Sequence, residues 1–268
     1  MNVTNHNRKA WNKKVKNQIS YTKPVEQHTI TKAGKGDWAI TLTTKKMVPR
    51  EWFPSSLQGV RVLCLASGGG QQGPVLAAAG AEVTVVDISE KQLEQDDYVA
   101  ERDGLTLETI RGDMMNLYFF EDEFFDIIVH PVSNLFVEDI QFVWEEAARV
   151  LKPNGTFISG FTNPLLFIFD EEEELKGNLV VTNAVPSSTL TNLTDEEIQA
   201  YLNTGETVEF AHTLEAQIQG QIKAGFAITG FYEDNFGGNR PIDRYINSFC
   251  VTKAVKLSDS LGGVRNYS

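Results

Sequence analysis

Short apolar runs and amphipathic stretches alternate through the middle of the chain. Strand-like patterns occupy residues 60–66, 82–87, 105–110, 124–130 and 156–161, and the first of these is the nearly continuous apolar run of a buried strand. Apolar residues at helical spacing fill the segments 71–79, 89–102 and 139–151 between these runs. Repeated strand, helix and strand at this spacing predicts a parallel sheet with helices on both faces.

The two ends of the chain depart from this alternation. Residues 1–58 combine two helical stretches with one short alternating segment at residues 38–42, which predicts a strand. Near the C-terminus, strand patterns at residues 226–232 and 245–252 are joined by a loop too short to hold a crossover helix, so they should be antiparallel. The predicted fold class is therefore α/β: a doubly wound, mostly parallel seven-stranded sheet with helices on both faces and the last strand antiparallel.

The same pattern divides the chain into a core and two additions. We expect residues 59–268 to form a Rossmann-like domain, and residues 1–58 to form an extension of helices and one strand that caps its site. Inside the core, residues 163–212 are irregular and rich in Thr, Ser and Asn, which is typical of an insertion. The extension and the insertion together are predicted to form a lid.

Glycines gather directly after the first predicted strand, at Gly68, Gly69, Gly70 and Gly73. A backbone without Cβ atoms can turn tightly there and lie against a ligand at the carboxyl ends of the strands. On spacing alone, the segment also fits a dinucleotide-binding loop, because Asp87 lies where an acid would hold the ribose in an NAD-dependent enzyme. The glycines by themselves therefore leave the cofactor open.

Three further features favour a different adenosyl cofactor. Gly112-Asp113-Met114 follows the third strand, where a carboxylate can accept from an adenine amino group while Met114 packs on the ring. Residues 149–155 lead into the fifth strand, and the chain ends in an antiparallel pair instead of further parallel units. With the segments 62–70, 85–89 and 125–128, these features resemble the class I S-adenosylmethionine-dependent methyltransferases of small-molecule type, over roughly residues 59–162 and the terminal hairpin.

This resemblance implies a cofactor, S-adenosylmethionine with S-adenosylhomocysteine as product, and methyl transfer to a small-molecule acceptor by in-line displacement. It assigns cofactor contacts to Ala66, Ser67, Gly68, Gly69, Gly70, Gln71, Asp87, Ile88, Ser89, Gly112, Asp113, Met114 and His130. Asp87 would hold the ribose hydroxyls, and Asp113 would meet the adenine between Ile88 and Met114.

Two positions depart from the family pattern. Cys64 stands where the family usually has an acid, and Ala66 stands where it usually has a glycine. The acid normally helps to fix the glycine loop or the amino end of the methionine moiety. Two alternatives therefore remain: an NAD(P)-dependent oxidoreductase, and a catalytically silent protein that binds S-adenosylmethionine.

His130 is the candidate general base, because it ends the fourth strand, where the active site of this fold lies. A histidine there could equally anchor the backbone. Substrate contacts are expected from Trp52, Phe53, Asn134, Asn163 and His212. The additions also hold aromatic residues that could line a lid, namely Trp11, Tyr21, Trp38, Phe161, Phe167 and Phe169.

Charge and composition narrow the function classes. The 24 Lys and Arg against 36 Asp and Glu give a net charge of −12, which argues against nucleic-acid binding. No apolar run is long enough to span a membrane and no secretory signal is present, so a cytoplasmic location is expected. Two cysteines cannot form a disulfide framework or a zinc cluster, and no His or Cys pair has metal-binding spacing. We therefore predict no metal, while nothing in the pattern specifies an oligomeric state.

Overall fold

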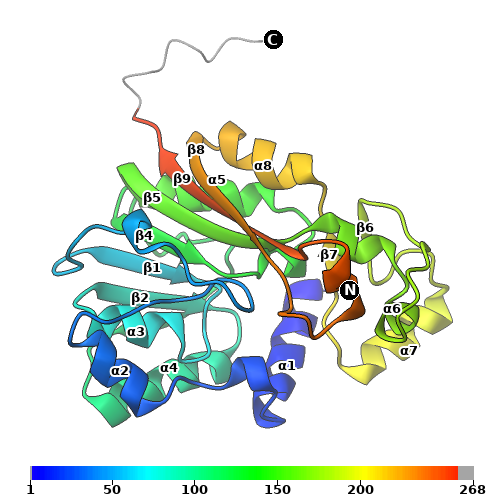
Figure 1. Cartoon of the computed structure of the whole chain (residues 1–268), viewed down its shortest axis with the longest axis horizontal. Coiled ribbons are helices and arrows are strands. Elements are labelled where there is room, and N and C mark those ends of the chain that lie inside the picture. The colour runs from blue at the N-terminus through cyan, green and yellow to red at the C-terminus, as the bar shows by residue number, and fades with distance from the viewer. Residues whose placement is uncertain (1, 259–268) are drawn as a thin grey trace.

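A seven-stranded sheet forms the centre of the molecule in the computed structural model, which describes residues 2–258 (Figure 1). Its strands are β1 (Arg61–Leu65), β2 (Glu82–Asp87), β3 (Glu108–Arg111), β4 (Phe125–His130), β5 (Leu151–Thr162), β8 (Phe226–Asp234) and β9 (Phe249–Lys256). They lie in the order β3-β2-β1-β4-β5-β9-β8. Strands β1 to β5 pair in parallel, whereas β9 is antiparallel to both β5 and β8. The predicted fold class is confirmed.

Helices cover both faces of this sheet. The α-helices are α1 (Val3–Lys16), α2 (Gln27–Ala33), α3 (Gln72–Ala78), α4 (Glu90–Asp103), α5 (Gln141–Val150), α6 (Glu171–Leu175), α7 (Asp195–Thr204) and α8 (Leu214–Lys223). The 3-10 helices are η1 (Ser20–Thr22), η2 (Arg50–Trp52), η3 (Asn134–Phe136), η4 (Pro164–Ile168) and η5 (Pro241–Arg244). Figure 1 shows α3 and α4 on one face of the sheet and α5 and α8 on the other.

Strand β1 shows how the apolar pattern builds two cores. Val62 and Cys64 belong to the apolar core that also contains residues of α3 and α4, and Leu63 and Leu65 belong to the core that contains residues of α5. All four side chains are buried, because a parallel strand covered by helices on both faces has no solvent side. Trp144 of α5 is also fully buried, and its indole N–H donates to the Ala216 carbonyl oxygen at 3.1 Å.

The strand predicted at residues 38–42 does not form. This segment makes one isolated bridge, between Thr41 and Met47, and lies outside the sheet. Ile40 and Leu42 are nevertheless buried in the core that contains residues of α3 and α4. The alternation therefore reflects burial of every second side chain against this core, without a neighbouring strand to complete a ladder.

Residues 163–212 are more regular than the sequence indicated. They contain η4, α6, α7 and a two-stranded sheet of β6 (Ser187–Ser188) and β7 (Phe210–Ala211). Helix α7 begins with a capping box, in which the Thr194 side chain accepts from the Glu197 N–H and Glu197 accepts from the Thr194 N–H. In Figure 1 this part of the chain lies beside the main sheet, with α1 between it and α4. Among the described residues, no helix is long and apolar enough to span a bilayer.

Candidate active site

A cavity of about 980 Å³ lies at the carboxyl ends of the parallel strands. One part is lined by the loops that follow β1, β2 and β3. A second part is lined by residues of α1, of the segment 163–212 and of the loop between β8 and β9. A volume near the top of the usual range for small-molecule sites has room for two molecules side by side.

The loop between β1 and α3 packs so tightly that small residues are required. Ala66 and Gly70 adopt left-handed backbone angles, with φ of +48° and +70°. A Cβ atom on Gly70 would lie 2.7 Å from the Gln95 carbonyl oxygen, and one on Gly68 would lie 2.8 Å from the Gln92 Cβ. Glycine at these positions therefore lets the loop press against α4.

Two buried carboxylates hold this glycine loop. Asp87, at the end of β2, accepts from the backbone N–H of Gly68 at 3.0 Å and of Ser89 at 2.8 Å. Asp96, on α4, accepts from the backbone N–H of Gly69 at 2.9 Å. Burial raises the pKa of Asp87 to about 6 and that of Asp96 to about 8, against the opposing effect of these N–H donors. The N–H groups of Gly68 and Gly69 are therefore hydrogen-bonded to two different elements, β2 and α4.

The loop after β3 brings Gly112, Asp113 and Met114 to the cavity wall. The Asp113 carboxylate accepts from the Met115 N–H at 2.9 Å, which fixes the turn that presents it. Met114 is buried and lies in the same apolar core as residues of α5. The loop thus places a carboxylate and an apolar side chain together at the cavity.

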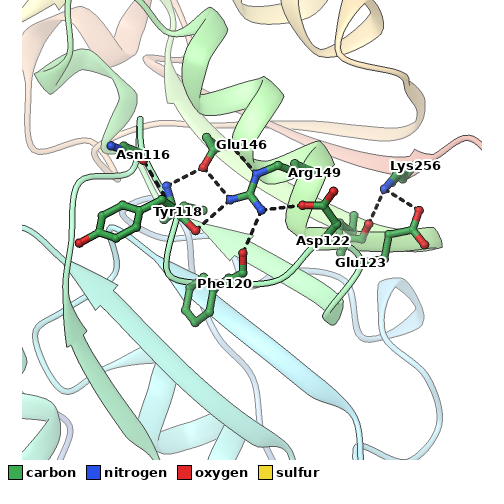
Figure 2. Close-up of polar contacts among 10 residues, drawn as sticks. Asn116, Tyr118, Phe120, Asp122, Glu123, Glu146, Arg149 and Lys256 are labelled. Carbon is green, nitrogen blue, oxygen red and sulfur yellow. Dashed lines mark hydrogen bonds and ion pairs between the residues drawn. The ribbon is translucent and has the colours of Figure 1, made fainter.

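Arg149, at the end of α5, supports this loop from outside the cavity (Figure 2). Its guanidinium donates to the carbonyl oxygens of Leu117 and Phe120 at 2.8 and 2.9 Å, and it pairs with Asp122 and Glu146 at 2.8 Å. Glu146 also accepts from the Leu117 N–H at 2.6 Å. The hydrogen bond from Arg149 lowers the pKa of Glu146, and the same contact raises that of Arg149. This network explains why an arginine opens the segment 149–155.

The chemistry of the cavity wall fits an adenosyl group. The Asp87 carboxylate lines the cavity, and its two internal hydrogen bonds leave acceptor sites for two more donors, as the adjacent hydroxyls of a ribose would supply. Ile88 and Met114 supply apolar surface near Asp113, which suits an aromatic base that carries an amino group.

Most residues predicted for the cofactor line this cavity: Ala66, Ser67, Gly68, Gln71, Asp87, Ile88, Gly112, Asp113 and Met114. The others, Gly69, Gly70, Ser89 and His130, are absent from its wall. Ser89 instead caps α4, where its hydroxyl accepts from the Gln92 N–H at 3.1 Å and donates to Asn12 at 2.7 Å. Its place in the chain beside Asp87 reflects helix capping.

His130 ends β4 as predicted, but the structure does not support its role as a general base. The ring is fully buried beside Trp144 and Phe157 and does not line the cavity. Its Nδ1 donates to the Leu65 carbonyl oxygen at 2.9 Å, and Nε2 is buried without a partner. Burial lowers the pKa of His130 to about 4, so the ring is neutral at physiological pH. His130 therefore braces the end of β1, directly before the glycine loop.

None of the residues predicted for the substrate lines the cavity. Trp52 packs against Tyr232, with ring centroids 5.5 Å apart. Phe53 packs edge to face against Trp38 at 5.1 Å. Both rings come before β1 in the chain, but Trp52 packs on β8, and Phe53 lies in the apolar core that contains residues of α3 and α4. The structure places neither ring in the cavity wall, and their role as substrate contacts stays a prediction.

The polar residues predicted for the substrate form hydrogen bonds within the protein instead. The Asn134 amide donates to the Gln217 side chain at 2.8 Å, and the Asn163 amide donates to the Asn247 carbonyl oxygen at 3.0 Å. His212 Nε2 lies 2.9 Å from the Val137 carbonyl oxygen. Burial lowers the pKa of His212. A position after a strand indicated nearness to the site, while the direction of each side chain depended on tertiary packing.

Aromatic side chains line the second part of the cavity. Of the rings predicted for a lid, Trp11, Tyr21, Phe167 and Phe169 lie in its wall, and Phe136, Phe236 and Phe249 join them. Trp38 and Phe161 do not reach it. Trp11 lies edge to face against Phe136 at 5.2 Å and Tyr21 at 6.0 Å. These rings give the cavity a large apolar surface beside the polar glycine loop.

The charged groups of this second part differ in their pairing. Lys14 pairs with Glu206 at 2.9 Å, and Arg240 pairs with Glu174. The Glu209 carboxylate lines the cavity and accepts from the Thr207 hydroxyl at 3.1 Å. Burial raises the pKa of Glu209. Both cations of the wall are therefore neutralised, while Glu209 has a neutral partner.

Sequence reasoning missed Gln92 and Asp96. With Ser89 they lie at the spacing i, i+3 and i+7, which places them on one face of α4. Gln92 is buried and lines the cavity, and its Oε1 has no partner. The helical spacing of three polar residues after Asp87 was the signal that could have identified them. Within residues 2–258, no group of three or more His, Cys, Asp and Glu side chains is arranged to bind a metal ion, and the absence of a metal stays a prediction.

Comparisons with known proteins agree with this geometry. The family model described as a methyltransferase domain matches residues 63–159. A Bacillus subtilis protein named uncharacterized methyltransferase YbaJ is 54% identical over 252 residues, which cover 94% of this chain and 98% of the relative. A sterol 24-C-methyltransferase of Gibberella zeae is 33% identical over 37% of this chain and 27% of its own length. The crystal structure of an S-adenosylmethionine-dependent methyltransferase from Mesorhizobium loti aligns with a TM-score of 0.59 and 20% identity, over 77% of this chain and 95% of that one.

Proposed function

The chain belongs to the class I S-adenosylmethionine-dependent methyltransferases, and from this premise we propose that it methylates a small, partly apolar acceptor bound between α1 and residues 163–212. The observation that carries the proposal is a single cavity with two kinds of wall. The glycine loop, Asp87 and Asp113 supply the polar wall, and Trp11 and Phe167, with the other rings named above, supply the aromatic one.

The cofactor contacts are proposed from the polar wall. Asp87 accepts hydrogen bonds from the ribose hydroxyls, and Asp113 accepts from the adenine amino group. Ile88 and Met114 pack against the base. Gln92, whose buried Oε1 is unpartnered beside the glycine loop, adds a polar contact that the sequence did not suggest.

S-adenosylmethionine supplies a methyl group that is already activated on a sulfonium. The protein then has to align the acceptor with that methyl group, and alignment can contribute about 7–11 kcal/mol to lowering the barrier. Helix α1 serves this end by spanning the site. Arg8 pairs with Glu90 of α4 at 2.7 Å, while Lys14 pairs with Glu206 beyond α7 at 2.9 Å. Fixed to α4 near its middle and to the segment after α7 near its C-terminal end, α1 keeps water from the reacting groups.

Glu209 replaces His130 as the proposed general base for an acceptor that must lose a proton. Its carboxylate lines the cavity, whereas the His130 ring does not. The raised pKa of Glu209 brings its proton affinity closer to neutrality, which improves a carboxylate as a base. Glu209→Gln is expected to lower kcat by about 100-fold or more and leave cofactor binding unchanged. Full turnover by this variant on the true acceptor would exclude the role.

Two further expectations from the sequence remain predictions. These are a cytoplasmic location and the lack of a nucleic-acid partner. The silent alternative predicts cofactor binding without methyl transfer to any acceptor. The oxidoreductase alternative receives no support from the comparisons.

Calorimetry followed by a substrate screen tests the proposal. S-adenosylmethionine and S-adenosylhomocysteine should bind the wild type, while NADH should not. Asp87→Ala removes the acceptor for two hydroxyl donors and should weaken binding by about 100-fold or more. Asp97→Ala removes an exposed carboxylate of α4 and is the matched control. Incubation with methyl-labelled cofactor and a whole-cell extract, separated afterwards into small molecules and macromolecules, then identifies the acceptor, and label confined to the macromolecules would contradict the proposed acceptor class.

A further inference from the structure

The first strand lacks the acid that would steady the glycine loop, and Cys64 stands in its place. The Cys64 side chain is fully buried among apolar residues of β2, α3 and α4, including Val75, Val85 and Val99. Burial raises the pKa of this thiol well above its ordinary value, and the nearby Asp96 carboxylate raises it further. Cys64 is therefore a neutral apolar side chain, which cannot anchor the loop amides as a carboxylate would.

Asp96 brings a carboxyl group, whose oxygens can accept, to the same place from another element. It is fully buried on the inner face of α4, and its Oδ2 accepts from the Gly69 N–H at 2.9 Å. Its Oδ1 is buried without a partner. The neighbouring amide, that of Gly68, is bound to Asp87 at 3.0 Å. The two acidic side chains thus accept from adjacent amides of the loop.

Close packing of α3 against α4 makes this approach possible. A Cβ atom on Gly73, in α3, would lie 2.7 Å from Val85 Cγ2 and 3.2 Å from Asp96 Oδ1. Glycine at this position leaves room for the Asp96 carboxyl group between the helices. Burying a carboxyl group here is costly, so its retention calls for a specific contact, and the Gly69 amide supplies one.

We propose that Asp96 is the positioning residue that fixes the glycine loop for the cofactor, in place of the acid that β1 lacks at Cys64. The inference rests on the proposed function, because it takes the loop as the cofactor site. Asp96 lies outside the cavity wall, so it acts through the backbone of Gly69 and not by touching the cofactor. Without this bond, Gly69, whose φ is +129°, is free to leave the conformation that the cofactor needs.

Binding of S-adenosylhomocysteine by four variants tests the inference. Asp96→Ala should raise the Kd at least tenfold and leave kcat at saturating cofactor within about twofold of the wild type. Asp96→Asn keeps an oxygen acceptor for the Gly69 N–H and should recover most of the loss. The double variant Cys64→Asp/Asp96→Ala returns a carboxylate from β1 and should bind at least fivefold more tightly than Asp96→Ala. Asp97→Ala, on the exposed face of α4, should match the wild type.

The outcomes separate this inference from the proposed function. Tight binding by the wild type with an unchanged Kd in Asp96→Ala overturns the inference alone. A loss in Asp96→Ala that neither Asp96→Asn nor the Cys64→Asp exchange relieves also overturns it, because a merely structural role would give that result. A wild type that binds no adenosyl compound overturns both. Thermal unfolding without cofactor, measured on every variant, identifies a variant whose affinity is lost because it misfolds. If Asp96→Ala misfolds, the Kd of Asp96→Asn compared with that of the wild type decides.

Discussion

The buried His130 makes the stability of the fold depend on pH in a way that can be isolated. In the unfolded chain the imidazole has its ordinary pKa near 6.5. In the folded protein burial lowers that pKa to about 4, and Nδ1 donates to Leu65 while Nε2 meets no partner. Between these two values the unfolded chain binds a proton that the folded protein does not. The contribution of the neutral, buried His130 ring to the free energy of unfolding is therefore fully present above about pH 6.5, and it is lost as the pH falls toward 4.

His130→Asn is the perturbation that removes this effect, because an asparagine amide nitrogen occupies nearly the position of Nδ1 and can still donate to Leu65. Linkage with these two pKa values gives a loss of about 1.3 kcal/mol in the wild type between about pH 7.5 and about pH 5.5, which the variant should not show. The figure depends little on the folded value, because at about pH 5.5 the folded ring is already almost entirely neutral. The variant should be less stable at every pH, since a smaller side chain leaves a cavity beside Trp144.

Urea unfolding followed by tryptophan fluorescence over this pH range measures the difference between the two proteins. Asp87 and Asp96 also titrate in the folded state with raised pKa values, but both proteins carry them, so their effects cancel in the difference. His28→Asn, at an exposed histidine, controls for the loss of a histidine as such. Parallel stability curves for the wild type and His130→Asn would refute the argument that the ring is held neutral by burial.

Three further predictions follow from the site and its supports. Asp87 must be ionised to accept two ribose hydroxyls, so cofactor affinity measured by calorimetry should fall about tenfold per pH unit below about pH 6, and a flat profile would contradict its role. Arg149→Met should cost about 2 kcal/mol in urea unfolding and raise the KM for the cofactor with little change in kcat, because the loop that carries Asp113 loses its support. Glu174, almost fully buried, pairs with Arg240 and accepts from the Ile242 N–H at 2.9 Å, so Glu174→Gln should lower stability by about 2–4 kcal/mol and raise the KM for the acceptor while the cofactor Kd stays constant.

The sequence was sufficient for the central sheet because its signals are local. Buried parallel strands are continuous apolar runs, and β1 is one of them. The start of α4 could also be predicted from the sequence, since Ser89 caps the helix by accepting from the Gln92 N–H. The strand predicted at residues 38–42 does not form, because its signal was local while its pairing is not. Alternation records which side chains are buried, and a strand also needs a partner that the local sequence does not reveal.

Residues whose role depends on backbone position were also found from the sequence. Gly68 was identified because it belongs to a glycine cluster directly after a strand, and Asp87 because it ends the next strand; the structure brings the two together and leaves no space for a Cβ on Gly68. Both positions follow from the order of strand, loop and helix, because the loops that follow parallel strands lie at the same edge of the sheet. The sequence therefore determined which backbone segments meet at the proposed cofactor site.

The direction of side chains and the partners they meet were decided by tertiary structure alone. His130 stands at the expected strand end, but packing turns its ring inward, away from the cavity. Cys64 signalled a missing acid, and only the packing of α3 against α4 shows Asp96 beside the loop, 32 residues further along the chain. Local sequence specifies the course of a backbone, whereas contacts between distant residues arise from how the elements pack, and the aromatic wall of the cavity is made of such contacts.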